Sequence, residues 1–122
     1  MDTIDWQHLL FQFDGRINRA KFWIGIVAVY AATWILFIIA AAANSSALWV
    51  IAAVGSLAAI WPYVAVQIKR WHDRDKAGWW VFIAFIPLIG TIWVLVECGF
   101  LPGTEGPNQY GVDPLGNPGY GI

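Results

Sequence analysis

The order of apolar and polar positions divides the chain into a short amphipathic segment, three long apolar segments and a polar tail. No charged residue occurs between positions 22 and 68, and none occurs between 77 and 96. A helix rises ~1.5 Å per residue and needs roughly 20 apolar residues to cross ~30 Å of hydrocarbon. Because lipid offers the backbone no hydrogen-bond partners, segments of this kind are expected to be helical.

The first apolar run is too long for one span, and it is interrupted by Asn-Ser-Ser at 44–46, residues that favour turns and helix caps. The pattern therefore predicts transmembrane helices over residues 22–43, 47–68 and 79–96. Pro62 and Pro87 each lack a backbone donor, so they predict bends in the second and third helices. The fold class is all-α integral membrane, in a single membrane domain over residues 1–122.

The segments before and after these helices differ in character. Residues 5–14 predict an interfacial amphipathic helix, because four apolar residues follow i, i+3, i+4, i+7 spacing. They are Trp6, Leu9, Leu10 and Phe13. Residues 97–122 are rich in glycine and proline, which predicts an irregular tail built of turns.

The composition supports the membrane assignment, with 59% hydrophobic and only 12% charged residues. Soluble domains carry about a quarter charged residues. Lysine and arginine occur before the first helix and between the second and third, but not in the first connection or the tail. By the positive-inside rule, this predicts a cytoplasmic N-terminus and a periplasmic C-terminus in a multi-pass inner-membrane protein.

The stretch KRWHDRDKAG, residues 69–78, contains six of the 15 charged residues. As a catalytic loop it offers His72 beside Asp73 as base and orienting group, but no nucleophile accompanies them. It lacks the ligand spacing of a metal site, and its mixed charges disfavour nucleic acid. We interpret it as a loop that contacts anionic headgroups at the cytoplasmic face. No catalytic, cofactor or metal site is predicted. Glu97 is expected to reach the outer headgroups rather than form an ion pathway.

Three stretches, FDGRINRAKFW (13–23), KRWHDRDKAGWW (69–80) and GTEGPNQYGVDP (103–114), together with IPLIG (86–90), resemble a bacterial inner-membrane family known as domain of unknown function 805. The resemblance implies a fold and a location, but no reaction. It also implies a set of structural or interaction residues. They are Gly15, Arg16, Arg19, Phe22, Trp23, Arg70, His72, Asp73, Gly78, Trp79, Gly103, Thr104, Gly106, Asn108, Tyr110, Gly111 and Asp113.

Three functional hypotheses follow. The first is a non-enzymatic accessory or scaffold subunit of a larger membrane complex, favoured by the small size and by tryptophans deep in the helices. The second is a homo-oligomeric channel or transporter, lined by Tyr30, Glu97 and the helix break at 87–90. The third is a protein that handles lipid headgroups through His72 and Asp73.

Overall fold

The structure is a computed structural model that describes residues 4–116 and is helical throughout its regular elements in that range. The elements are α1 (Trp6–Phe11), α2 (Arg19–Ala43), α3 (Ser46–Ala58), α4 (Ile60–Asp73), the 3₁₀-helix η1 (Gly78–Phe85), α5 (Ile89–Val94) and the π-helix η2 (Leu95–Phe100). The predicted all-α class is therefore confirmed for the described residues. Residues 117–122 of the predicted tail lie outside them.

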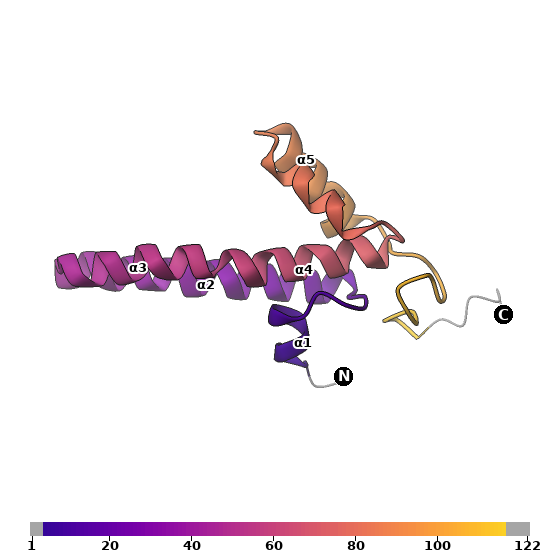
Figure 1. Cartoon of the computed structure of the whole chain (residues 1–122), viewed down its shortest axis with the longest axis horizontal. Helices are drawn as coiled ribbons and strands as arrows, with labels where there is room; N and C mark the ends of the chain where they lie inside the picture. The colour runs from indigo at the N-terminus through magenta and orange to yellow at the C-terminus, as the bar shows by residue number, and fades with distance from the viewer. Residues whose placement is uncertain (1–3, 117–122) are drawn as a thin grey trace.

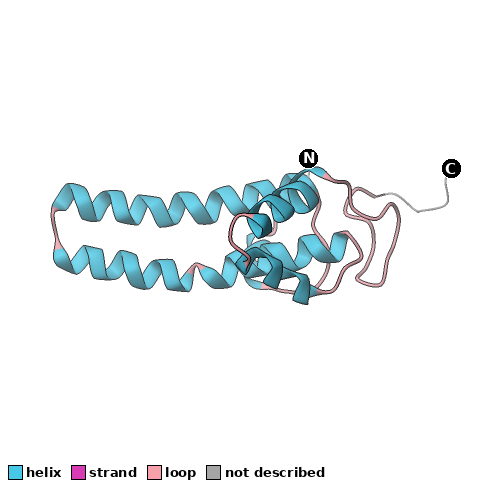
Figure 2. Cartoon of the chain, turned by 90° about the horizontal axis from the view of Figure 1, so that it is seen from above, coloured by secondary structure: helices cyan, strands magenta, loops and turns pink. Residues whose placement is uncertain are grey.

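A long helical hairpin forms the body of the molecule (Figures 1 and 2). Asn18 caps the start of α2 by accepting from the Lys21 amide, and Asn44 ends it in the left-handed conformation. Ser45 then caps α3. Two apolar helical stretches, Arg19–Ala43 and Ser46–Asp73, are long enough to cross a bilayer.

The second apolar stretch differs in two ways from the helix predicted over residues 47–68: it is interrupted near its middle, and it ends later. Pro62 lacks the amide that would bond to Ala58, and the helix is interrupted at Ala59, between α3 and α4. Beyond position 68, α4 continues to Asp73, so the first half of the predicted charged loop is helical. Lys69 and Arg70 are fully buried there, so the interpretation of these two residues as part of a headgroup-contacting loop is wrong. For the rest of the stretch it stays a prediction.

The predicted third transmembrane helix over 79–96 is not formed as one helix. The chain makes η1, turns at residues 86–88 and returns as α5 and η2. Within the turn, Leu88 has a positive φ of 63°. The eight residues of η1 rise about 16 Å, and the six residues each of α5 and η2 together rise about 18 Å. Each arm is too short to cross ~30 Å of hydrocarbon. We call residues 78–100 the returning hairpin.

The returning hairpin brings the tail back to the end of the molecule where α2 begins and α4 ends (Figure 1). The Arg16 side chain donates there to the carbonyls of Thr104 and Gly106. The tail therefore lies beside the two basic motifs, and not opposite them as predicted, because the third apolar segment turns back on itself.

The hydrophobic core lies at this same end, where α1, α2, α4 and the returning hairpin meet. α1 packs against α4, with the Trp61 indole donating to the Phe11 carbonyl at 3.0 Å and the Lys69 ammonium to the Leu9 carbonyl at 2.9 Å. The buried core residues are Leu9, Ile17, Phe22, Val66, Trp71, Val81, Val94 and Cys98. The far halves of α2 and α3 expose most of their large apolar side chains. The core thus fixes the end of the molecule that carries the motif residues.

Candidate functional site

The Arg16 side chain joins the three motif stretches. Its Nε and Nη2 lie 3.0 Å and 2.9 Å from Oδ1 of Asp73 at the end of α4. Its Nη1 donates to the Gly106 carbonyl at 2.7 Å, and its Nη2 donates to the Thr104 carbonyl at 2.6 Å. A planar guanidinium with five donors suits this role, because it can bind a carboxylate and several carbonyls at once.

Asp73 lies between two arginines and is only 4% exposed. Its Oδ1 binds Arg16, and its Oδ2 is 2.5 Å from Nη1 of Arg70. Its backbone carbonyl accepts from the Thr104 amide at 2.6 Å. Gly103 permits this approach, since a Cβ there would lie 2.0 Å from Oδ2 of Asp73. The buried Asp73 carboxylate and the two buried arginines compensate one another's charge. Removal of the carboxylate would leave both arginines buried without an anionic partner.

The basic and tryptophan side chains of the motifs cap the end of η2. Five successive carbonyls, those of residues 98–102, each accept a hydrogen bond from a side chain. The donors are Arg70 Nε to Cys98 at 2.6 Å, Trp23 Nε1 to Gly99 at 2.9 Å, Arg19 Nη1 to Phe100 at 2.7 Å, Arg70 Nη2 to Leu101 and Arg74 Nη1 to Pro102. The last carbonyls of a helix lack partners within the helix, and positive charge stabilises this end. These side chains therefore hold the returning hairpin to α2 and α4.

His72 connects the N-terminal loop to the tail. Its Nδ1 donates to the Gly15 carbonyl at 2.9 Å, and its ring stacks on Tyr110 with centroids 3.9 Å apart. The side-chain amide of Asn108 donates to the His72 backbone carbonyl at 2.9 Å. Both carboxylate oxygens of Asp73 bind arginines, so the base-and-orienter arrangement that we considered for His72 and Asp73 is not the one the structure forms.

Asp113 folds the tail into turns. Its two oxygens accept from the amides of Gly106 and Leu115, both at 2.9 Å. Gly106 and Gly111 have positive φ angles of 82° and 135°, which suit glycine at these turns. The Gly111 carbonyl also accepts from Arg16, at 3.2 Å. We call Arg16, Arg70, His72, Asp73 and tail residues 103–113 the polar cluster.

Most residues that the resemblance implies meet in or beside the polar cluster, but not all do. Phe22 belongs to the hydrophobic core. Gly78 begins η1 and leaves room for Ile68, whose Cγ2 would lie 3.0 Å from a Cβ there. Trp79 is exposed and stacks on Trp80, 5.0 Å away, outside the polar cluster.

Glu97 has a different environment from the one predicted. It is buried, and its carboxylate binds Lys76, Arg74 and the Trp93 indole, the last at 2.9 Å. Burial raises the pKa of Glu97, but these hydrogen bonds and positive charges outweigh it, so the pKa lies below its ordinary value. The expectation that Glu97 reaches headgroups on the far side is wrong, because the returning hairpin places it beside the second basic motif.

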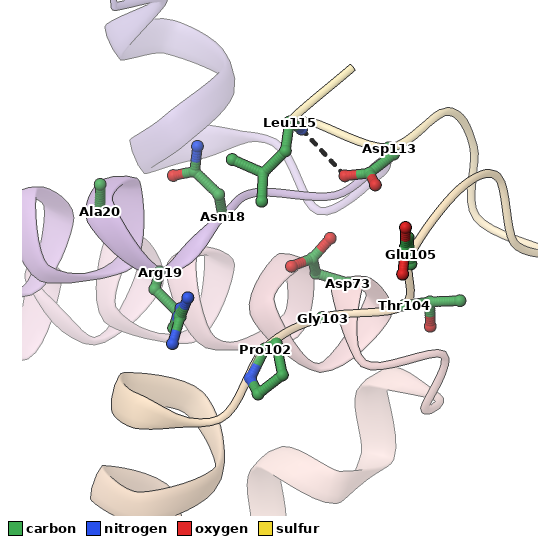
Figure 3. A pocket seen from close by; sticks show the side chains of 10 residues that line it. All are labelled: Asn18, Arg19, Ala20, Asp73, Pro102, Gly103, Thr104, Glu105, Asp113 and Leu115. Carbon is green, nitrogen blue, oxygen red and sulfur yellow. Dashed lines mark hydrogen bonds between the residues drawn. The ribbon is translucent and has the colours of Figure 1, made fainter. Parts of the chain in front are cut away.

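A cavity of ≈480 Å³ opens where the three motif stretches meet (Figure 3). Its walls come from the start of α2, the end of α4 and the tail. They are formed by Asn18, Arg19, Ala20, Asp73, Pro102, Gly103, Thr104, Glu105, Asp113 and Leu115. Within residues 4–116, no set of three or more His, Cys, Asp and Glu side chains gathers as metal ligands would.

The sequence profile of a family described as "Protein of unknown function (DUF805)" matches residues 10–112. This range contains the last two residues of α1, both long helices, the returning hairpin and nearly all of the polar cluster. The chain belongs to the DUF805 family. The resemblance seen in its motifs is thereby confirmed, and the chain is a helical membrane protein.

The chain is also similar to three proteins of Escherichia coli. It is 32% identical to the uncharacterized protein YiiR of Escherichia coli K12, over 88% of each chain. It is 29% identical to the inner membrane protein YhaH of the same organism, over 84% of this chain and 86% of YhaH. The inner membrane protein YhaI is 43% identical over 53 residues. No solved structure matches the chain.

Proposed function

We propose that the protein has two membrane spans and a returning hairpin, with its polar cluster and both termini at the cytoplasmic face of a bacterial inner membrane. All seven lysine and arginine residues lie at positions 16–76 near the polar-cluster end, and the connection between α2 and α3 has none. This distribution is the one that the positive-inside rule associates with a cytoplasmic end. The names of YhaH and YhaI, both inner membrane proteins, support the location.

A reporter fused after residue 122 tests this orientation. We expect a fluorescent protein at the C-terminus to fluoresce and alkaline phosphatase at the same site to be inactive, because the tail packs against the N-terminal motif. Alkaline phosphatase inserted between Asn44 and Ser45 is expected to be active. An active phosphatase at the C-terminus would refute the orientation.

Within this orientation, we propose a non-enzymatic accessory or scaffold role in which the outer face of α2 packs against another membrane protein. The observation that carries it is Trp34, which is 62% exposed. Trp34 lies ~22 Å along α2 from Arg19 and ~14 Å from Ala43. Membrane tryptophans concentrate at the two interfaces, so an exposed one at mid-helix suggests a protein contact.

The polar cluster is consistent with this role. Its arginines and Asp73 are occupied with one another and with backbone carbonyls, which makes the cluster a rigid base for the helices. Such bonds orient the α2 face without providing an activated nucleophile or base. The α2 face exposes large apolar side chains, and large exposed apolar surfaces mark membrane or protein contacts.

Photo-crosslinking at position 34 tests the proposed contact. A photoreactive amino acid in place of Trp34 is expected to crosslink one membrane protein in native membranes. The same substitution at Val54, which is 61% exposed on α3, gives the background for an equally accessible apolar position. Crosslinking to a second copy of the chain would instead favour the homo-oligomeric channel. Protein crosslinks no stronger than those at Val54 would count against any partner on this face.

Lipid-headgroup handling is a second candidate, favoured by the cavity beside Asp73, whose walls include charged and polar side chains. The cavity lies at the N-terminal end of α2, where a spanning helix would meet the headgroups. This candidate differs from the hypothesis drawn from the sequence, because the cavity wall contacts the headgroup instead of a His72–Asp73 pair. Lipid analysis of the complex purified in a lipid-retaining polymer separates the two candidates. One enriched headgroup without a protein partner would favour the second.

A further inference from the structure

An apolar groove of ≈380 Å³ runs along one face of the helix formed by α5 and η2. Positions 89, 92, 93 and 96 follow the i, i+3, i+4, i+7 spacing that places side chains on one helix face. The lining residues are Ile89, Ile92, Trp93, Val96, Glu97 and Leu101. Ile89 and Ile92 are exposed, so the groove is open to its surroundings.

Two partly exposed cations lie at one end of the groove. Glu97 forms part of its wall, and its carboxylate binds both Lys76 and Arg74. Two cations therefore share the Glu97 carboxylate, and Asp75, the exposed residue between them in the sequence, is a second acidic group nearby. The side chains of Lys76 and Arg74 remain 30% and 22% exposed. The Lys76 ammonium also lies 4.7 Å from the centre of the Trp80 ring, which helps to position it.

The groove is apolar at one end and charged at the other, as a phospholipid is. Ile89 lies beside the turn of the returning hairpin, and Glu97 and Leu101 lie at the polar-cluster end. If the polar cluster is at the membrane surface, the apolar part of the groove extends toward the bilayer centre and its charged end reaches the headgroups. Basic side chains at this level attract anionic lipids.

We propose that this groove binds an anionic phospholipid, with one acyl chain along Ile89, Ile92 and Val96 and its phosphate at Lys76 and Arg74. The proposal rests on the proposed membrane orientation, but not on the accessory role. The two cations favour this occupant, because an apolar helix of a protein partner would offer no acceptor to the partly exposed Lys76 and Arg74 side chains. An anionic phospholipid supplies both the apolar chain and the negative group.

Native mass spectrometry of the full chain tests the proposal. The protein is released from nanodiscs that contain phosphatidylglycerol and phosphatidylcholine with identical acyl chains, and the retained lipid is counted. We expect retained phosphatidylglycerol to exceed phosphatidylcholine. In Lys76→Gln this preference is expected to fall about fivefold, the factor that corresponds to ~1 kcal/mol per basic residue near an anionic surface. Lys21→Gln, which removes a lysine of α2 near the same end, is the matched control and is expected to keep the preference.

A second variant keeps the proposal testable if Lys76→Gln fails to fold. Ile92→Trp fills an exposed position of the groove and is expected to abolish lipid retention, whereas Ile38→Trp, at an exposed position of α2, is expected to retain it. Equal retention of both lipids by the native chain would overturn the proposal. So would equal losses in Lys76→Gln and Lys21→Gln, or unchanged retention in Ile92→Trp. Crosslinking at position 34 does not depend on this result, so failure of one proposal leaves the other intact.

Discussion

Asp73→Asn is expected to lower the free energy of unfolding by about 3 kcal/mol or more, the cost of leaving buried charge unpaired. Asp73 is the anionic partner of two buried arginines, Arg16 and Arg70. Asparagine keeps the size of the side chain but removes its negative charge. Thermal unfolding of the purified protein in detergent, followed by tryptophan fluorescence, measures the change.

The same variant has a second measurable consequence. Arg70 connects Asp73 to the carbonyls of Cys98 and Leu101, so a displaced Arg70 should loosen η2. Cys98 is the single cysteine of the chain and is fully buried. We expect a maleimide to label Cys98 faster in Asp73→Asn than in the native protein.

Asp75→Asn is the matched control for Asp73→Asn. Asp75 is exposed and has a positive φ of 61°, a conformation that asparagine tolerates well. We expect its unfolding temperature and Cys98 labelling to match those of the native protein. Equal effects of the two substitutions would mean that loss of any carboxylate near this end, and not the buried ion pairs, explains the result.

The first two apolar helices could be predicted because their evidence is local. Uninterrupted apolar sequence determines their position, and Asn44 and Ser45 supply the turn and the cap between them. The Asn18 cap at the start of α2 is equally local. α4 was predicted too short, because Lys69 and Arg70 look like residues of a solvated loop. Their partners are carbonyls of α1 and η2 that no local pattern identifies.

The third apolar segment could not be placed by composition. Its length and hydrophobicity satisfy the requirements of a spanning helix, and the sequence at 86–90 indicated only a bend or break. The reversal depends on contacts within the returning hairpin, where the Gly90 amide donates to the Ile86 carbonyl at 2.9 Å. Whether a proline bends a helix or ends it depends on such neighbours.

The candidate site was also predictable only in part from the sequence. The family resemblance selected most residues of the polar cluster, but reasoning from residue chemistry did not show what they contact. Lys69 and Glu97 were not selected, although both are buried and paired. Glu97 meets Lys76 only because the returning hairpin folds back, so an error in topology became an error in the site.

Gly90→Ala is expected to open the returning hairpin, because the added methyl has no room. A Cβ at position 90 would lie 1.9 Å from the Ile83 carbonyl oxygen and 3.0 Å from its carbon, and both are backbone atoms that cannot rotate away. Overpacking of a well-packed site costs about 1–3 kcal/mol, and we expect this variant to lie near the upper value. Thermal unfolding and the rate of Cys98 labelling measure the loss of stability and the exposure of η2.

Thr91→Ala, at the adjacent exposed position of α5, separates this steric effect from a general sensitivity of the helix. Alanine has the higher helix propensity at both positions, so propensity alone predicts stabilisation in each variant. We expect Thr91→Ala to unfold at or above the native temperature with Cys98 still protected. If Gly90→Ala behaves in the same way, η1 and α5 do not pack as closely as the structure indicates, and a straight third helix would again be the better description. If only Gly90→Ala exposes Cys98, the close approach at position 90 is what returns the chain to the polar cluster.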